Sequence, residues 1–293
     1  MASDATLSWR DLIEESTRRL GDALGGDRRQ EARWLVERVS GYSAPELFLN
    51  EVEAVSARSV AFFDALVARR CTGEPLQYVL GHWSFRTLEL HLTRDVLIPR
   101  PETEYVAGMA IAAAISAATH GPPTVVDLGT GSGAIALSVA AEVPSSRVWG
   151  TDVSEVALRM ARANLAGMGR AGTRVTMCLG SWFDALPPEL AGAIDVLVSN
   201  PPYVSRDAPL PDDVRDHEPH LALFADDDGF ECVHTVLSNA PAWLRPGGIV
   251  VVEMGETQTQ RAVALTRSVG LVEVETIVDL TGRPRGLTAR RPR

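Results

Sequence analysis

The sequence predicts an α/β domain built on a mostly parallel sheet and preceded by a small helical bundle. Two observations lead to this prediction. From residue 123 onward, apolar segments of strand length alternate with helical segments, and such alternation requires a parallel sheet covered on both faces. Before residue 75, the apolar residues follow helical spacing alone. We therefore expect a helical domain over 1–75, a linker over 76–95 and the α/β domain over 96–293.

The pattern of the first 75 residues predicts a bundle of helices. The first helix begins near Ser8, which can form a capping pair with Asp11. The second runs from about Arg28 to Val39, a turn is expected at Pro45–Leu49, and Ser56 caps the third helix. Nothing in this region resembles a catalytic cluster, so we expect it to bind a partner.

A β-hairpin is predicted to link the two parts. Apolar and polar residues alternate there on two short segments, whose apolar members are Trp83, Phe85, Leu88, Leu90 and Leu92. Pro101 then suits the first turn of a helix, which we expect over 101–118. Its apolar run from Met109 to Thr119 is too short to span a membrane, so we expect no membrane segment.

The α/β part is predicted to contain a seven-stranded sheet. Strands are expected near 124–128, 147–151, 174–178, 194–199, 248–254, 272–278 and 286–290. Helices are expected near 133–142, 154–166, 229–244 and 257–269. No helix separates the last two strands, so the final strand is expected to run antiparallel. The stretch from Val204 to Asp228 is predicted to be an irregular loop, and loops of this length are usually functional or mobile.

The charge balance limits the choice of partners. A formal net charge of −10 argues against a protein that holds nucleic acid mainly by attraction to phosphates. We therefore expect no direct sequence-specific contact with DNA or RNA. A C-terminal basic run is either a solvated tail or a contact for RNA or an acidic partner, and it contains Arg283, Arg285, Arg290, Arg291 and Arg293.

Cysteine usage and the start of the chain predict the cellular compartment. The three cysteines, Cys71, Cys178 and Cys232, lie far apart, which is typical of reduced thiols in a cytosolic protein and not of a disulfide framework. No basic stretch leads into an apolar one near the start, so we expect no signal peptide. The protein is expected to be a cytoplasmic monomer.

A glycine-rich turn joins the first strand of the predicted sheet to its first helix. Its sequence is Asp127-Leu128-Gly129-Thr130-Gly131-Ser132-Gly133. Glycines let the backbone approach a ligand closely, and the helix N-terminus supplies unpaired N–H groups. The next strand ends at Asp152, where an acid suits the two hydroxyl groups of a ribose. These residues predict a site for an adenosine-containing cofactor.

Two kinds of cofactor fit this turn. The spacing Gly129-x-Gly131-x-x-Ala134 also satisfies the loose dinucleotide pattern, so NAD is a competitor. Asp127 can hold a cationic amine, and no later region pairs a His with an acid as hydride transfer requires. Both observations favour a nucleotide-type cofactor other than NAD.

The tetrapeptide Asn200-Pro201-Pro202-Tyr203 follows the apolar strand at 194–199. Asn offers a carbonyl acceptor and an amide donor, and each proline holds the main chain rigid while its carbonyl is free to accept. The Tyr ring adds a flat face on which a planar group can stack. The pattern predicts a binder of amides or nucleobase amines, and a proline-rich turn without a ligand is the alternative.

Several segments resemble known methyltransferases. "VVDLGTGSGAIALSVA" with Asp152 resembles the first two motifs of the Rossmann-like S-adenosylmethionine methyltransferases, and "VSNPPYV" is similar to their amino-methylating motif. The segments "EPLQYVLG", "VLIPRPETE", "ALFADDDGFE" and "DLTGRPRGLTARR" resemble the HemK family of glutamine methyltransferases, in the same order. The likeness spans nearly the whole chain. It implies a Rossmann-like methyltransferase sheet, an N-terminal substrate-recognition domain and S-adenosyl-L-methionine as cofactor.

The resemblance also implies an activity. The substrate is then the side-chain amide nitrogen of the glutamine in the Gly-Gly-Gln loop of peptide chain release factors. Asn200–Tyr203 hold and orient that amide, and Asn200 also meets the cofactor. The loop Gly129–Gly133 surrounds the cofactor, Asp127 holds its amino-acid end and Asp152 its ribose.

Four further residues are candidates through the same resemblance. Trp182 packs beside the adenine or belongs to the core. Arg100 and Glu102 close over the cofactor or form a helix-capping turn. Glu253 lines the cleft or ends a strand.

Other functions stay open from the sequence. The nearest is a sister enzyme that methylates a glutamine of a ribosomal protein, and a more distant one is an adenine-amino methyltransferase acting on a flipped base. A catalytically idle module that binds translation factors is a third. A metal site is not expected, because His217 and His220 have no Cys or third His nearby in the sequence.

Overall fold

The computed structural model of the chain describes residues 7–293, which divide into two compact units. One unit contains the chain up to His82 together with Leu210–His217, and the other contains Trp83–Pro209 and Glu218–Arg293. Residues 1–6, which the sequence assigns to the helical domain, lie outside the described residues. The crossing at His82–Trp83 lies inside the predicted linker, whereas Leu210–His217 of the first unit come from the stretch assigned to the α/β domain.

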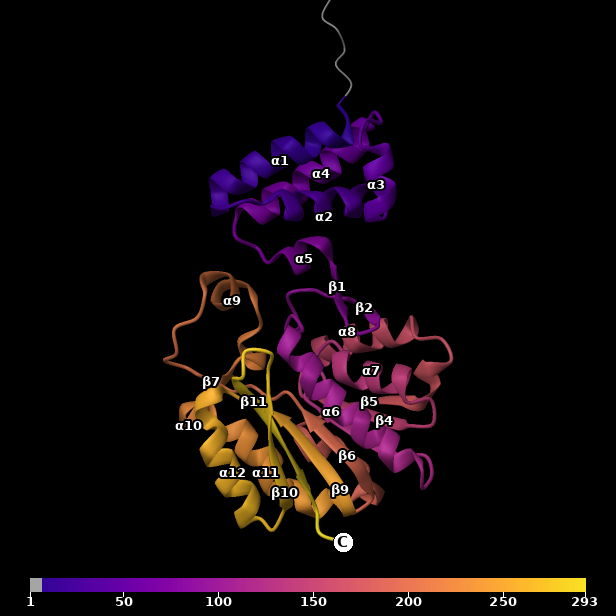
Figure 1. Ribbon diagram of the computed structural model, residues 1–293, viewed down its shortest axis with the longest axis vertical. Coiled ribbons are helices and arrows are strands. Elements are labelled where there is room, and N and C mark those ends of the chain that lie inside the picture. The colour runs from indigo at the N-terminus through magenta and orange to yellow at the C-terminus, as the bar shows by residue number, and fades with distance from the viewer. Residues whose placement is uncertain (1–6) are drawn as a thin grey trace, which may run out of the picture. The chain divides into compact units, whose positions relative to one another are not determined.

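The first unit is helical, as predicted (Figure 1). Its helices are α1 (Trp9–Leu24), α2 (Arg29–Ser40), α3 (Ala44–Asn50), α4 (Ala57–Cys71), α5 (Leu76–Leu80) and α9 (Asp212–His217). Ser8 and Asp11 form the predicted capping box, in which Ser8 N donates to Asp11 Oδ2 at 2.8 Å. Ser56 caps α4 by accepting from Ser59 N at 3.1 Å.

The prediction of a turn at Pro45–Leu49 is wrong, because these residues lie in α3. Ser43 and Glu46 form a capping box there, with Ser43 N donating to Glu46 Oε2 at 2.8 Å. Pro45 stands in the first turn, where its missing N–H is not needed. A helix this short has no repeated apolar spacing, so a local capping signal is its main sign in the sequence.

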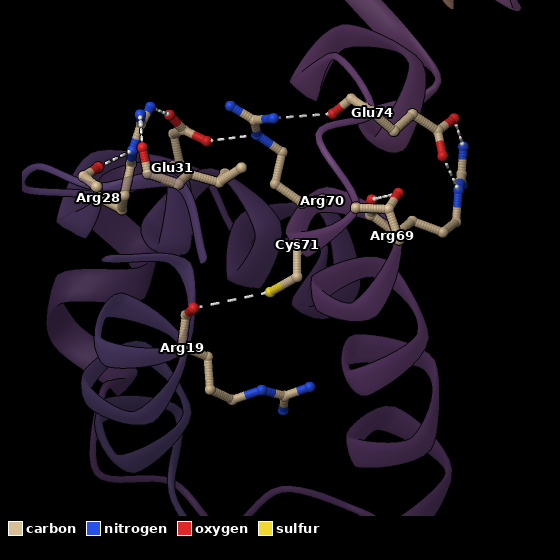
Figure 2. Close-up of polar contacts among 10 residues, drawn as sticks. Arg19, Arg28, Glu31, Arg69, Arg70, Cys71 and Glu74 are labelled. Atoms are coloured by element: carbon tan, nitrogen blue, oxygen red, sulfur yellow. Dashed lines mark hydrogen bonds and ion pairs between the residues drawn. The ribbon is translucent and has the colours of Figure 1, made fainter. Parts of the chain in front are cut away.

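Ion pairs join α2 to α4 (Figure 2). The carboxylate of Glu31 accepts from Arg70 Nε at 2.7 Å and from Arg28 Nη1 at 2.5 Å. Arg70 also donates to the Glu74 carbonyl at 3.0 Å, and Arg69 Nε donates to the Glu74 carboxylate at 3.0 Å. Burial raises the pKa of Glu31, but the hydrogen bonds from Arg70 and Arg28 outweigh burial and hold the pKa below its ordinary value.

The second unit contains the predicted sheet (Figure 1). Its strands are β3 (Thr124–Leu128), β4 (Arg147–Asp152), β5 (Val175–Leu179), β6 (Ile194–Ser199), β9 (Leu244–Glu253), β10 (Val272–Val278) and β11 (Pro284–Arg290). They lie in the order β10-β11-β9-β6-β3-β4-β5. Neighbours from β9 to β5 are parallel, and β11 is antiparallel to both β9 and β10. The predicted seven-stranded α/β fold is confirmed, including the reversal of the final strand.

Helices cover both faces of this sheet. They are α6 (Pro101–Ala118), α7 (Ala134–Glu142), α8 (Glu155–Ala166), α11 (Glu231–Trp243) and α12 (Thr259–Ser268). Figure 1 shows α6 and α7 on one side and α11 with α12 on the other. The predicted hairpin is formed by β1 (His82–Phe85) and β2 (Leu88–His91), before α6. Among the helices of residues 7–293, none is long and apolar enough to cross a membrane.

The centre of the sheet is apolar on both faces. On one face, the fully buried residues of β3, β6 and β9 are Val126, Leu128, Leu197, Val250 and Val252. On the other face, Val125, Val198 and Val251 of the same strands are also fully buried. Strands buried on both faces carry continuous apolar runs, which is why they were visible in the sequence as apolar segments. This rigid core holds the strand ends where the candidate site lies.

The stretch between Val204 and Asp228, predicted to be irregular, contains short ordered elements. In the second unit, β7 (Val204–Ser205) pairs in parallel with β8 (Phe224–Ala225), and the irregular turn α10 (Asp226–Gly229) follows. Elements of two to four residues are too short to show a repeated apolar spacing, so the sequence pattern does not predict them.

Replacing Glu31 with Gln should destabilise the helical unit, because Arg28 and Arg70 lose their shared carboxylate. We expect a loss of about 1–3 kcal/mol, measured as faster hydrogen exchange of α2 and α4 amides by mass spectrometry.

The lowered pKa of Glu31 also makes the stability of this unit depend on pH. Its contribution is fully present above the ordinary carboxyl pKa and is lost as the pH falls through the pKa of Glu31 in the folded protein.

Glu15→Gln is the matched control. Glu15 is 47% exposed and lies 3.8 Å from Arg19 on the same helix. A surface pair of this kind contributes less than about 0.5 kcal/mol. Equal losses in the two variants would contradict the stabilising role of Glu31.

Candidate active site

Three chain segments meet at the carboxyl edge of the sheet. β3 lies between β4 and β6, and its last residue, Leu128, pairs with Thr151 on one side and Ser199 on the other. The Ser199 hydroxyl also donates to the Leu128 carbonyl at 2.7 Å. The glycine loop, Asp152 and Asn200 therefore leave the sheet side by side. Ligands of open α/β sheets bind at such an edge, where neighbouring connections diverge.

A cavity of about 320 Å³ lies at this edge. Predicted site residues that line it are Gly129, Gly131, Asp152, Trp182, Asn200 and Pro202. Small-ligand sites have volumes of this order. The structure therefore brings the glycine loop and part of the tetrapeptide to one cavity.

The glycine loop is held from two sides. Gly131 has a φ of +56°, which favours glycine, and its N–H donates to Asp152 Oδ2 at 2.9 Å. Thr130 donates through its hydroxyl to Asp127 Oδ2 at 2.7 Å. A Cβ at Gly133 would stand 3.0 Å from a leucine side chain of α7. The backbone course of the loop thus depends on both aspartates and on glycine at these positions.

Asp127 lies beneath the loop and does not line the cavity. Its Oδ2 accepts from Thr130 and from Ala136 N, the latter at 3.1 Å. Its Oδ1 is buried and has no hydrogen-bond partner within residues 7–293. Burial raises the pKa of Asp127 to about 7. An unpaired buried carboxylate oxygen fits the predicted contact with a cationic amine, and that contact stays a prediction.

Asp152 lines the cavity at the end of β4. Its Oδ1 accepts from Ser154 N and its Oδ2 from Gly131 N, both at 2.9 Å. Burial raises the pKa of Asp152, and these main-chain hydrogen bonds oppose the shift. Each carboxylate oxygen keeps a further lone pair, so the side chain can still accept from the two hydroxyls of a ribose.

Trp182 forms a wall of the same cavity. Its Cζ3 lies 3.7 Å from the position that a Cβ on Gly129 would take. The next residue, Phe183, stacks on Trp243 with ring centroids 5.5 Å apart, which anchors the turn in the core. The indole is thus both a cavity wall and a partly buried aromatic, so the two interpretations of Trp182 are compatible.

Asn200 and Pro202 form another part of the wall. Asn200 Nδ2 donates to Thr103 Oγ1 of α6 at 3.1 Å. This hydrogen bond turns the amide nitrogen toward α6 and leaves Oδ1 as an acceptor. Pro201 is buried and does not line the cavity. Asn200 and Pro202 are therefore the two residues of the tetrapeptide that line the cavity.

Tyr203 lies behind the wall and packs against the core. Its hydroxyl donates to Glu253 Oε1 at 3.3 Å. Burial, with the neighbouring carboxylate of Glu253, raises the pKa of Tyr203. Burial likewise raises the pKa of Glu253 to about 7. Glu253 does not line the cavity, and the predicted stacking of Tyr203 on a substrate stays a prediction.

The turn after β8 supports the main chain of Tyr203. Asp227 and Asp228 both have a φ of 55°, an uncommon conformation for non-glycine residues. Gly229 follows with a φ of +82°, and a Cβ there would stand 2.3 Å from the Tyr203 carbonyl oxygen. Gln258 Nε2 donates to the same carbonyl at 3.0 Å. The segment "ALFADDDGFE" therefore holds the end of the tetrapeptide.

Arg100 and Glu102 do not line the cavity. Arg100 Nη2 donates to Glu218 Oε1 at 2.5 Å. Glu102 pairs with Arg285 at 3.3 Å, and Arg285 Nε also donates to Asp279 at 2.8 Å. These contacts tie the start of α6 to neighbouring segments, and closure of Arg100 and Glu102 over a cofactor stays a prediction.

Part of the cavity lining was not predicted from the sequence. These lining residues precede α6 or end the long loop, and they are Asp95, Val96, Leu97, Leu221, Ala222 and Phe224. Most of these side chains are apolar, and an apolar side chain does not by itself indicate a ligand site. The signal in the sequence was the family resemblance, because the segments "VLIPRPETE" and "ALFADDDGFE" overlap these two regions.

No metal cluster is present in the part of the chain that the structure describes: no three His, Cys, Asp or Glu side chains are grouped to hold an ion. His220 packs edge-on against Phe224 with ring centroids 5.2 Å apart, and His217 ends α9.

Comparison with known proteins identifies the family. The chain is 40% identical over 286 residues to the release factor glutamine methyltransferase of Streptomyces coelicolor, covering 95% of this chain and 96% of the relative. It is 42% identical over 255 residues to the protein of the same name from Bordetella pertussis, covering 87% of this chain and 92% of the relative. The chain belongs to the release factor glutamine methyltransferase family.

Family models and a solved structure agree with this membership. The PrmC N-terminal domain matches residues 11–81, and the methyltransferase small domain matches residues 111–212. A methyltransferase from Pyrococcus furiosus shares the fold at 19% identity and a TM-score of 0.50, over 70% of this chain and 90% of that chain. The predicted family, the methyltransferase class and S-adenosylmethionine as cofactor are confirmed.

Gly229→Ala should displace the wall of this methyltransferase site, because the new Cβ meets the Tyr203 carbonyl. Gly270→Ala is the matched control, since its φ of +85° is similar and nothing lies within 4 Å of a Cβ there. We expect about 1 kcal/mol of destabilisation in the control, from the left-handed backbone alone, and about 2 kcal/mol more for Gly229→Ala. Urea unfolding measures both, and equal losses would contradict the contact.

Proposed function

We propose that this protein transfers the methyl group of S-adenosylmethionine to the side-chain amide nitrogen of the glutamine in the Gly-Gly-Gln motif of peptide chain release factors. Family membership supports a glutamine substrate in a release factor. The tetrapeptide Asn200–Tyr203 supports an amide as the methylated group.

One observation carries the proposal. Asn200 and Pro202 line the same cavity as Gly131 and Asp152, and Asn200 Nδ2 is already bound to Thr103. With Nδ2 engaged, Oδ1 is the acceptor that the Asn200 side chain can offer to a ligand in this cavity. An amide NH2 in that cavity can donate a hydrogen bond to Asn200 Oδ1. A carboxylate or carbonyl oxygen in the same place would be repelled, because both groups are acceptors.

Orientation is the main chemical task of this site. An amide nitrogen is a weak nucleophile because its lone pair is delocalised into the carbonyl group. If Asn200 Oδ1 and the Pro201 carbonyl each accept one amide hydrogen, the nitrogen lone pair points along one direction. Such alignment contributes up to about 7–11 kcal/mol in favourable systems.

The chain's own residues supply position and electrostatics. When bound, S-adenosylmethionine supplies an activated methyl group on a sulfonium. Gly129, Gly131 and Trp182 offer a close-fitting wall, and Asp152 offers acceptors for ribose hydroxyls. Asp127, with its unpaired buried oxygen, is the residue suited to hold the cationic amine.

The remaining expectations belong to the same proposal. Action in the cytoplasm is supported by three cysteines that form no disulfide. Recognition of the release factor by the helical domain, action as a monomer and the lack of direct nucleic-acid contact are expectations from the sequence. The net charge of −10 supports the last of them.

The purified protein with methyl-labelled S-adenosylmethionine should label a release factor that contains Gly-Gly-Gln. Labelling should disappear when that glutamine is replaced by Ala. Transfer to a ribosomal protein or an oligonucleotide, with none to release factors, would contradict the proposed substrate.

Asn200→Ala should lower kcat at least about 100-fold, because the amide loses its alignment. The Kd of S-adenosylhomocysteine, measured by calorimetry, should change less than about threefold, since the cofactor loop is untouched. Asn239→Ala is the control: Asn239 is exposed on α11 and its Nδ2 donates to the Thr235 carbonyl of the same helix, so kcat should not change. Equal losses of turnover and cofactor affinity in Asn200→Ala would contradict the orienting role.

A further inference from the structure

A buried carboxylate stands behind the tetrapeptide. Glu253, the last residue of β9, is 1% exposed. Its Oε1 accepts from the Tyr203 hydroxyl, but its Oε2 is buried and has no hydrogen-bond partner in the structure of residues 7–293. Leaving such an oxygen unpaired costs about 1–3 kcal/mol, so its retention calls for a partner or a function.

A buried hydroxyl stands beside this carboxylate. Thr103, in the first turn of α6, is 3% exposed and accepts from Asn200 Nδ2 at 3.1 Å. In that hydrogen bond the Thr103 hydroxyl is the acceptor, so its own proton is available for another acceptor. The same hydroxyl is close enough to Glu253 to lower the pKa of that carboxyl as a hydrogen-bond donor. The packing places the two groups in the same region: α6, which carries Thr103, packs against β9, which ends at Glu253, and both residues bind the tetrapeptide. The Thr103 hydroxyl proton and the unpaired Glu253 Oε2 are thus a matching donor and acceptor.

We propose that Thr103 and Glu253 are positioning residues for Asn200: the Thr103 hydroxyl donates to Glu253 Oε2, presents only lone pairs to Asn200 and so keeps Asn200 Oδ1 directed to the substrate amide. The inference rests on the proposed function, in which Asn200 Oδ1 accepts a hydrogen from the glutamine. Nothing in this arrangement requires Thr103 or Glu253 to touch the substrate.

The Asn200 side-chain amide has two possible orientations, and only one of them presents Oδ1 to the substrate. A hydroxyl that is free to rotate can donate to Asn200 Oδ1 as easily as it accepts from Nδ2. Donation would flip the amide and present its NH2 to the substrate's NH2. Two donors would then face each other, and the substrate amide would lose one of its two acceptors. The Glu253 carboxylate prevents this flip, because it accepts the Thr103 hydroxyl proton and leaves only lone pairs for Asn200.

The charged groups around Glu253 predict a pH dependence. Burial is the largest influence on the pKa of Glu253 and raises it, and the nearby Glu102 carboxylate raises it further. The hydroxyls of Thr103 and Tyr203 and the charge of Arg285 lower this pKa, and the result is a pKa of about 7. The ionised form is the one that accepts from both hydroxyls, so kcat should rise with pH through the neutral range. Asp127 titrates in the same range, and Glu253→Gln separates the two, because it removes only the Glu253 contribution.

The kinetic test compares three changes at buried threonines. Thr103→Val removes the hydroxyl at nearly constant volume and should lower kcat at least about tenfold, with the Kd of S-adenosylhomocysteine unchanged within twofold. Thr103→Ser keeps the hydroxyl and should restore kcat to within about threefold of wild type. Thr266→Val is the control, since Thr266 is fully buried in α12 and donates only to the Ala262 carbonyl. It should lose similar stability and no turnover.

Combining the changes tests whether Thr103 acts through Asn200. In an Asn200→Ala background, Thr103→Val should have no further effect on kcat, because residues that act as one unit are not additive. A further tenfold loss in that background would overturn the inference, as would a Thr103→Val variant that keeps the kcat of Thr266→Val.

A second readout needs no substrate. The side-chain amide resonances of Asn200 in a ¹⁵N-labelled protein should shift with pH in the neutral range, and the shift should disappear in Glu253→Gln and in Thr103→Val. This readout decides the inference even if release factors are not the substrate, because it reports the Asn200 amide directly. The inference would be overturned if the pH-dependent shift of the Asn200 resonances were the same in both variants as in the wild type. Failure to label a release factor would overturn only the proposed function.

Discussion

The parallel pairing of β3 with β4 and β6 is the constraint on which the site depends. Because Leu128 pairs in register with Thr151 of β4 and with Ser199 of β6, the glycine loop, Asp152 and Asn200 reach one edge of the sheet together. Side chains of a strand alternate between faces, so a slip of one residue would reverse every side chain of that strand. The apolar core on both sheet faces holds this register.

A second feature of the molecule is the set of polar groups buried behind the cavity. Asp127 supports the glycine loop from below, and Glu253 with Thr103 lies behind Asn200. Burial raises the pKa values of both carboxyls to about 7, so each is held in a surrounding that disfavours its charge. Strongly shifted carboxyls cluster at functional sites, since a stable core would replace them with apolar residues. The left-handed turn at Asp227–Gly229 is a further strained element, and it supports the same wall.

Local chemistry explains which parts of the site the sequence could predict. The glycine loop, Asp152 and Asn200 each follow a strand directly, and their residue types suit a particular ligand group whatever surrounds them. The central strands were predictable because strands buried on both faces appear as apolar runs. The helix α3 was missed, because a seven-residue helix has no repeated spacing.

Long-range contacts explain what the sequence could not predict. Thr103 lies 97 residues before Asn200, and nothing in its local pattern points to a hydrogen bond with that residue. The contacts of Tyr203 with the core and, through its hydroxyl, with Glu253 likewise had no local signal in the sequence. Such contacts depend on how α6, β6 and β9 pack, which periodicity does not reveal.

The proposed role of Asn200 is to hold an amide NH2 by its side-chain oxygen. A crystal structure of the protein with S-adenosylhomocysteine and a peptide containing Gly-Gly-Gln would show this contact. We expect the glutamine amide nitrogen about 2.9 Å from both Asn200 Oδ1 and the Pro201 carbonyl, with the hydrogen bond from Asn200 Nδ2 to Thr103 retained. A glutamine amide bound elsewhere in the cavity, or an Asn200 amide turned with Nδ2 toward the peptide, would contradict it.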